Sequence, residues 1–162
     1  MSRTVKGLVA LAVGAAVVAG VPALADASTA TETHRAATPP TVNLDFSGTN
    51  SEAGAATAVG AGFGGTATMT NTSGTGIGTA YDMCDKDKLS LNAITAFCTV
   101  DLAFVTGDQI TFSAIVPIQD PLTATYPTSF DGVITGGTGA YQGLTGAVHI
   151  SNTDLGKYNL TW

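Results

Sequence analysis

The stretch FDGVITGGTGAYQGLTG, residues 130–146, poses the first question about the fold, because its glycines resemble those of a nucleotide-binding loop. Gly137, Gly139 and Gly143 follow directly after the strand-like VIT. A dinucleotide loop must lead into a helix whose N-terminus faces the pyrophosphate. Gly143 and Gly146 would each cost such a helix about 1 kcal/mol. A phosphate-binding loop would also need a Lys-Ser or Lys-Thr pair after its glycines, and this stretch has neither. The sequence therefore argues against a nucleotide site.

We interpret the same stretch as a tight connection between two strands. Glycines among residues 136–139 allow positive φ angles at low steric cost. Tyr141 then covers one end of the sheet, and LTGAVHI, residues 144–150, returns as the next strand. This interpretation requires strands on both sides of the connection.

Alternation of apolar and polar residues marks those strands. Apolar faces are formed by Val42, Leu44 and Phe46, by Cys98, Val100, Leu102 and Phe104, by Ile110, Phe112, Ala114, Val116 and Ile118, and by Tyr158, Leu160 and Trp162. Gly, Asn and Asp interrupt these runs, as in the turn TGD at 106–108. The pattern predicts an antiparallel sheet, and only SEAGAATA, residues 51–58, could form a helical turn.

A barrel is favoured over a sandwich for two reasons. The long apolar runs 100–104 and 110–118 would aggregate if they were left as open edges. Glycines also recur at strand ends and within strands, where sharp curvature requires them. We therefore expect an all-β fold closed into an antiparallel barrel.

The N-terminus has the features of an exported protein. Arg3 and Lys6 precede an apolar run at 7–21, and small residues of the Ala-x-Ala type follow. This predicts a secretory signal peptide over residues 1–25, with cleavage after Ala27 as the alternative. Residues 26–41 predict a flexible leader, and residues 42–162 the barrel domain. We expect a secreted protein with no membrane segment after cleavage.

Cleavage after residue 25 would leave four basic and twelve acidic residues, a net charge of −8. Nucleic acid binding requires a basic surface that displaces counterions from phosphates. The sequence therefore predicts no nucleic acid partner. An acidic surface of this kind is compatible with neutral or cationic ligands.

Cys84 and Cys98 are the two cysteines of the chain, and export makes a disulfide between them the expected state. The bond would close a fifteen-residue loop and contribute about 3 kcal/mol in the chain-entropy model. A free reactive thiol is the alternative, but neither cysteine has a nearby histidine in the sequence.

Metal binding is not indicated. His34 lies in the leader and His149 stands apart from other metal-binding residue types, which is too few ligands for zinc. The acidic run with Asp82, Asp85 and Asp87 lacks the Gly and Glu of an EF-hand. We expect this run to be a solvated loop, and we expect no metal and no cofactor.

VITGGTGAYQGLTGAVHI, residues 133–150, resembles the GGTG-aromatic-x-G-x-x-G signature of the allene oxide cyclase and dirigent superfamily. The chain is most similar to bacterial secreted members with an allene oxide cyclase barrel-like domain. GTAYDMC (78–84), the stretch 97–112 and the closing KYNLTW are also similar, so the resemblance covers about residues 42–162. The matching signature residues are Gly136, Gly137, Thr138, Gly139, Tyr141, Gly143 and Gly146.

The resemblance implies an eight-stranded antiparallel barrel with an apolar lumen open at one end, assembled as a homotrimer. It also implies a small hydrophobic ligand and an isomerase or cyclase that steers ring closure of an apolar substrate. Barrels of this strand number can hold one small ligand. The alternative is a non-catalytic secreted barrel, such as a ligand carrier or a surface or stress-related protein, with a lumen filled by side chains.

The candidate site residues follow from the same resemblance. Plant allene oxide cyclases point a carboxylate and a carboxamide from the first strand into the lumen, which nominates Asp45 as catalytic and Asn43 as ligand-binding, in reversed order. Asp101 is a second catalytic candidate if its face lines the lumen, whereas it meets solvent if the opposite, apolar face does. Tyr81 and Tyr141 are candidate hydrogen-bond donors to the ligand, with packing as the alternative.

Overall fold

The computed structural model describes residues 35–48, 58–90, 93–119 and 122–162. The predicted signal peptide lies outside these residues, as does all but the last residue of SEAGAATA. The barrel belongs to the unit Thr33–Trp162. Within the described part of the chain, no helix has the length and apolar character needed to span a bilayer.

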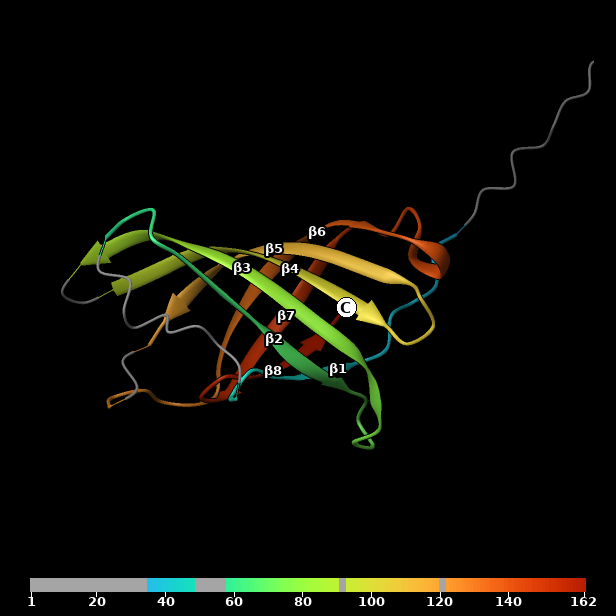
Figure 1. The fold of residues 1–162 in the computed structure, drawn as a ribbon, viewed down its shortest axis with the longest axis horizontal. Helices are drawn as coiled ribbons and strands as arrows, with labels where there is room; N and C mark the ends of the chain where they lie inside the picture. The colour runs from blue at the N-terminus through green and yellow to red at the C-terminus, as the bar shows by residue number, and fades with distance from the viewer. Residues whose placement is uncertain (1–34, 49–57, 91–92, 120–121) are drawn as a thin grey trace, which may run out of the picture. The chain divides into compact units, whose positions relative to one another are not determined.

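Eight strands form one closed antiparallel barrel in sequence order, and β8 pairs with β1 to complete it (Figure 1). This confirms the predicted fold class. The elements are β1 (Val42–Asp45), β2 (Gly62–Thr70), β3 (Gly76–Ser90), β4 (Ala93–Phe104), β5 (Gln109–Ile118), β6 (Thr128–Gly137), the 3-10 helix η1 (Gly139–Tyr141), β7 (Ala147–Asp154) and β8 (Lys157–Thr161).

The apolar faces predicted from alternation point into the barrel. Val42 and Leu160 are opposite each other, and both are fully buried. The other inward-facing side chains that are buried at the centre include Met69, Ala80, Leu102, Ile110, Phe112 and Val148. Successive side chains of a strand alternate between the two faces, so the polar residues between them lie on the outside.

The glycine-rich connection closes one end of the barrel, which we call the closed end. Its only helical element in the described residues is the three-residue η1, far short of a dinucleotide-binding helix. Tyr141 is buried there, with its ring 5.1 Å from that of Phe104. A side chain at Gly137 would come within 2.4 Å of the Tyr141 carbonyl oxygen. The connection is therefore a structural plug, as the turn interpretation predicted.

The end of the predicted leader also contacts this plug. The backbone N–H of Ala37 donates to the carbonyl of Ala140 over 2.8 Å. The indole N–H of Trp162 donates to the carbonyl of Pro40, also over 2.8 Å. Residues 35–41 thus run across the closed end without regular secondary structure.

The acidic run after Tyr81 is not a solvated loop, and that expectation was wrong. It is part of β3, whose fifteen residues pair with β2 and β4. The two strands β3 and β4 form a long hairpin that extends to the left in Figure 1. Cys84 and Cys98 are paired directly across this hairpin and form the predicted disulfide. Because the disulfide lies on the inner face, its neighbours two residues away, Asp82 and Lys86, face inward as well.

Candidate functional site

The end of the barrel opposite the plug differs from it in composition and exposure, and we call it the open end. Several inward-facing side chains there are only half-buried, although their strand positions match the core face, and some of them pack against a second buried cluster formed by Cys84, Ala96 and Cys98. Polar groups join them on the inner face. The half-buried inward-facing residues are Phe63, Asp82, Val116, Ile118, Phe130 and Tyr158.

Asp82 is a carboxyl group on the inner face of β3. It is aligned with Gly65 of β2 and with the buried Val100 of β4, which fixes its inward direction. The backbone N–H of Gly65 donates to its Oδ1. Burial raises the pKa of Asp82 above its usual value of 3.8, against the opposing effect of that hydrogen bond. This group can therefore hold or release a proton closer to neutrality than an exposed aspartate can.

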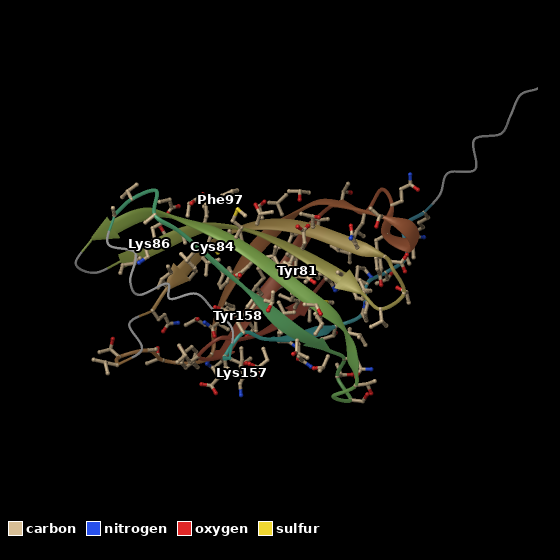
Figure 2. The ribbon with its side chains drawn as sticks, viewed as in Figure 1. Tyr81, Cys84, Lys86, Phe97, Lys157 and Tyr158 are labelled. Atoms are coloured by element: carbon tan, nitrogen blue, oxygen red, sulfur yellow. A yellow bond between two sulfur atoms is a disulfide. The ribbon has the colours of Figure 1, made fainter. Side chains whose placement is uncertain are left out.

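Tyr158 of β8 faces the same interior, opposite Leu44 on one side and Asn152 on the other. Burial raises its pKa to about 12, with further contributions from the charge of Asp82 and from Tyr126. Its hydroxyl therefore keeps its proton at neutral pH and can donate a hydrogen bond. Figure 2 shows Tyr158 directed toward the barrel, whereas the preceding Lys157 lies on the outer side.

Asn152 of β7 completes the inner polar group. It is 8% exposed, and its Oδ1 is enclosed without a hydrogen-bond partner. Buried polar atoms in folded proteins are almost always hydrogen-bonded, so such an atom requires an explanation. We refer to Asp82, Asn152 and Tyr158 as the inner polar triad.

The disulfide and a lysine continue the inner face of β3 beyond Asp82. The Sγ of Cys84 lies 3.9 Å from Asp82 Oδ2. Lys86 is 4% exposed, and its backbone N–H donates to the carbonyl of Ala61. Both residues are labelled in Figure 2, on the strand that carries Asp82. The disulfide thus fixes the strand pairing next to the carboxyl group.

The structure places the predicted pair Asn43 and Asp45 on the outer face of β1, because Val42 and Leu44 face inward. Asn43 links β1 to the β2–β3 turn by donating to the carbonyl of Asn71, and to β8 by accepting from the side chain of Asn159. Asp45 accepts hydrogen bonds from the N–H and hydroxyl of Ser47, and these lower its pKa. Both line a hollow of about 460 Å³ together with Leu44, Thr68, Thr70, Thr153, Lys157 and Tyr158.

Asp101 also lies on the outer face, where it accepts a hydrogen bond from the Thr111 hydroxyl over 2.6 Å. The apolar face of β4 lines the interior, so the solvent-facing alternative for Asp101 applies. Tyr81 is exposed on the outside next to it. Tyr141 is inside but belongs to the plug. The structure therefore does not bring the predicted site residues together in one cavity, and their functional roles stay predictions.

The inner polar triad was missed in the sequence because the acidic run was assigned to a loop. A signal was nevertheless present. Cys98 shares a face with Val100, so its disulfide partner Cys84 must share that face across a hairpin, and so must Asp82 two residues earlier. The alternation of Tyr158 with Leu160 and Trp162 did indicate its inward face, but no pattern in the sequence linked it to Asp82 or singled out Asn152.

The described residues contain no group of three or more His, Cys, Asp or Glu that could hold a metal ion. The inner face at the open end carries carboxyl, phenol and amide groups among apolar side chains.

Comparison with known proteins shows the fold. Searches against family models and against curated proteins found no match. Among solved structures, the chain is similar to pyocyanin demethylase, with a TM-score of 0.57 and 19% sequence identity. The match covers 75% of this chain and 96% of that protein. At this identity the likeness establishes a shared small antiparallel barrel.

Proposed function

We propose that this protein binds a small hydrophobic molecule in the open end of the barrel and acts on it by proton transfer. The observation that carries the proposal is the inward-facing Asp82, a carboxyl group with a raised pKa beside the protonated Tyr158. Titratable groups with shifted pKa values in a concave, largely apolar site are typical of functional sites.

The reaction class that fits these groups is an isomerisation or ring closure. Asp82 takes a proton from one position of the substrate and returns it to another, so no external oxidant, reductant or cofactor is consumed. Tyr158 donates a hydrogen bond to an oxygen or nitrogen on which negative charge develops. The apolar walls formed by Phe63, Val116 and Phe130 hold the substrate in one conformation and exclude water.

The structural neighbour supports the binding part of this proposal. Its name, pyocyanin demethylase, says that it acts on a small molecule. A barrel of the same class thus accommodates small-molecule chemistry.

Ligand binding at the open end can be tested with a fluorescent probe and two matched variants of β5. Val116 faces inward, whereas Gln109 of the same strand is exposed on the outside and lies outside the apolar outer face described below. We expect 1-aminoanthracene to bind the full chain, Val116→Trp to abolish binding and Gln109→Trp to leave it intact. Equal binding by both variants would reject the lumen as the ligand site.

The catalytic assignment requires a second comparison, made with a substrate found by screening neutral cyclic and polyene compounds. Asp82→Asn should lower turnover by about 10²- to 10⁴-fold, the usual contribution of a general acid or base. Asp131→Asn, a change on the outer face of β6, is the matched control. Asp45→Asn and Asp101→Asn test the catalytic roles predicted from the sequence.

A non-catalytic carrier is the second candidate, and the packed interior favours it. Met69, Leu102 and Phe112 fill the closed half of the barrel, so a ligand can occupy the open half alone. A carrier predicts that Asp82→Asn retains full binding and that no bound compound is chemically changed. Mass spectrometry of compounds recovered after incubation distinguishes the two candidates.

We also propose that the secreted protein self-associates, as a homotrimer, through the outer face of β3–β6. Five large apolar side chains are exposed there on adjacent strands: Tyr81, Met83, Phe97, Ile115 and Val133. Contiguous exposed apolar surface is characteristic of interaction sites. Light scattering of the full chain should give a trimer mass that Phe97→Asp reduces to that of the monomer, whereas a monomeric unmodified protein would exclude the assembly.

A further inference from the structure

Asn152 provides information about the ligand that Asp82 and Tyr158 do not. Its place on the inner face is fixed by its pairing with Tyr158 of β8 and Thr128 of β6. Its carboxamide oxygen is enclosed and accepts no hydrogen bond. In folded proteins such an acceptor is normally exposed to water or hydrogen-bonded to a donor, because an unpaired buried carbonyl costs free energy.

The neighbouring groups of the chain do not supply that donor. Tyr158 keeps its proton, but no hydrogen bond joins its hydroxyl to Asn152 or to any other described residue. Thr128 accepts a hydrogen bond from Gln119 over 2.7 Å, and no hydrogen bond joins its hydroxyl to Asn152 Oδ1. Asp82, when ionised, is an acceptor only.

We propose that Asn152 is a specificity-determining residue whose Oδ1 accepts a hydrogen bond from an N–H or O–H group of the ligand. This inference rests on the proposed function, since it assumes that the open end holds the ligand. It narrows the ligand to a mainly apolar compound that carries a hydrogen-bond donor for Asn152 and an acceptor for Tyr158. Replacing the donor of the ligand by an ether or a methyl group should lower its affinity.

Charge supports a neutral or cationic ligand of this kind. Asp82 lies on the same inner face, with Lys86 four residues further along β3, and the chain has a formal net charge of −6. An anionic carboxylate placed near Asn152 would meet a second acceptor and a like charge, both of which are unfavourable. A site that is built to receive a donor discriminates strongly against analogues that lack one, because its own polar group is then left unpaired.

Two matched probes test the inference: 2-naphthol, which has the donor, and 2-methoxynaphthalene, in which a methyl group replaces the hydroxyl hydrogen. We expect the full chain to bind 2-naphthol about tenfold more tightly than its methyl ether. Asn152→Leu, which is similar in size but has no acceptor, should reduce that ratio to near one. Asn152→Asp retains an acceptor and should retain the preference, and Ser151→Ala on the outer face is the control.

The outcomes separate this inference from the proposed function. If both probes bind with equal affinity and Val116→Trp abolishes binding, the open end is the ligand site and the role of Asn152 is rejected. If the preference for 2-naphthol persists in Asn152→Leu, another group or a bound water receives the donor, and the role is again rejected. If neither probe binds the unmodified protein, the proposed ligand class and the lumen site fail together.

Discussion

The closed and open ends of the barrel are built from the same strands but use their inward positions in opposite ways. At the closed end, Phe104, Ile110 and Tyr141 fill the interior, and the glycine-rich connection covers them. At the open end, the inner polar triad stands among half-buried apolar side chains. Stability is therefore expected to reside mainly in the closed half, which leaves the open half free to carry groups that are costly to bury.

The glycines illustrate the same division. Gly137 and Gly139 are required by close contacts, since a side chain at Gly139 would lie 1.9 Å from Asp108 Oδ1. That carboxylate accepts hydrogen bonds from the Ala140 N–H and the Thr106 hydroxyl, which lower its pKa. The glycine pattern that resembled a nucleotide-binding loop is thus explained by the close packing of the plug. It says little about the chemistry performed at the opposite end.

The largest expected difference between the two halves is in the cost of removing an aromatic ring. Phe112 is 2% exposed and is enclosed in the packed half, so Phe112→Ala should destabilise the protein by about 4 kcal/mol. Phe130 is half-buried at the open end, and Phe130→Ala should cost about half as much. Urea unfolding of both variants measures the change in the free energy of unfolding. Equal changes would contradict the unequal distribution of stability between the two halves.

A smaller effect is expected in the plug itself. Gly137→Ala should destabilise the fold by about 3 kcal/mol, because its Cβ would collide with the Tyr141 carbonyl oxygen. Gly143, unlike Gly137, has a positive φ, of 79°, and nothing lies within 4 Å of its missing Cβ. Gly143→Ala should therefore cost only about 1 kcal/mol, the penalty of the left-handed conformation. Thermal unfolding of the two variants compares their loss of stability. A larger loss in Gly143→Ala than in Gly137→Ala would refute the assignment of the plug.

These contrasts also explain how much the sequence could predict. Alternation in β1, β4 and β5 identified the faces correctly, because a half-buried strand must separate its apolar from its polar side chains. The resemblance, in contrast, predicted that Asn43 and Asp45 point into the lumen, whereas they lie on the outer face. The resemblance transferred residue types without register, and a shift of one position moves a strand residue to the opposite face. Long charged runs such as that in β3 look like loops when only local composition is considered.

The inner polar triad lies beyond what local patterns predict, because it depends on three strands meeting. Asp82, Asn152 and Tyr158 come from β3, β7 and β8 and are brought to one interior by closure of the barrel. Alternation with Leu160 indicated the inward direction of Tyr158, whereas the meeting of all three side chains follows only from the strand registers and the closure of the barrel. The disulfide would have given one of the three, which shows that a covalent constraint can locate a site residue that composition conceals.

The smallest predicted effect concerns the pH dependence of stability and tests the open end directly. Below pH 3.8, Asp82 is protonated in both the folded and unfolded states and contributes nothing. As the pH rises, the unfolded state releases its proton first, because burial raises the pKa of Asp82 in the folded state. Stability should therefore fall until the pH exceeds that raised pKa, and the loss should persist above it.

Asp82→Asn removes this cost while retaining an oxygen for the Gly65 N–H. Because solvent partly reaches the group and screens its charge, the gain in stability above neutral pH should be on the order of 0.5 kcal/mol. Urea unfolding between pH 4 and pH 8 measures it, with Asp131→Asn on the outer face as control. A stability gain combined with a loss of turnover would show that the open end retains its carboxyl group for function and at the expense of the fold. A variant with the same pH dependence as the unmodified protein would instead mean that Asp82 is solvated like an ordinary surface carboxylate, and the contrast between the two ends would lose its chemical content.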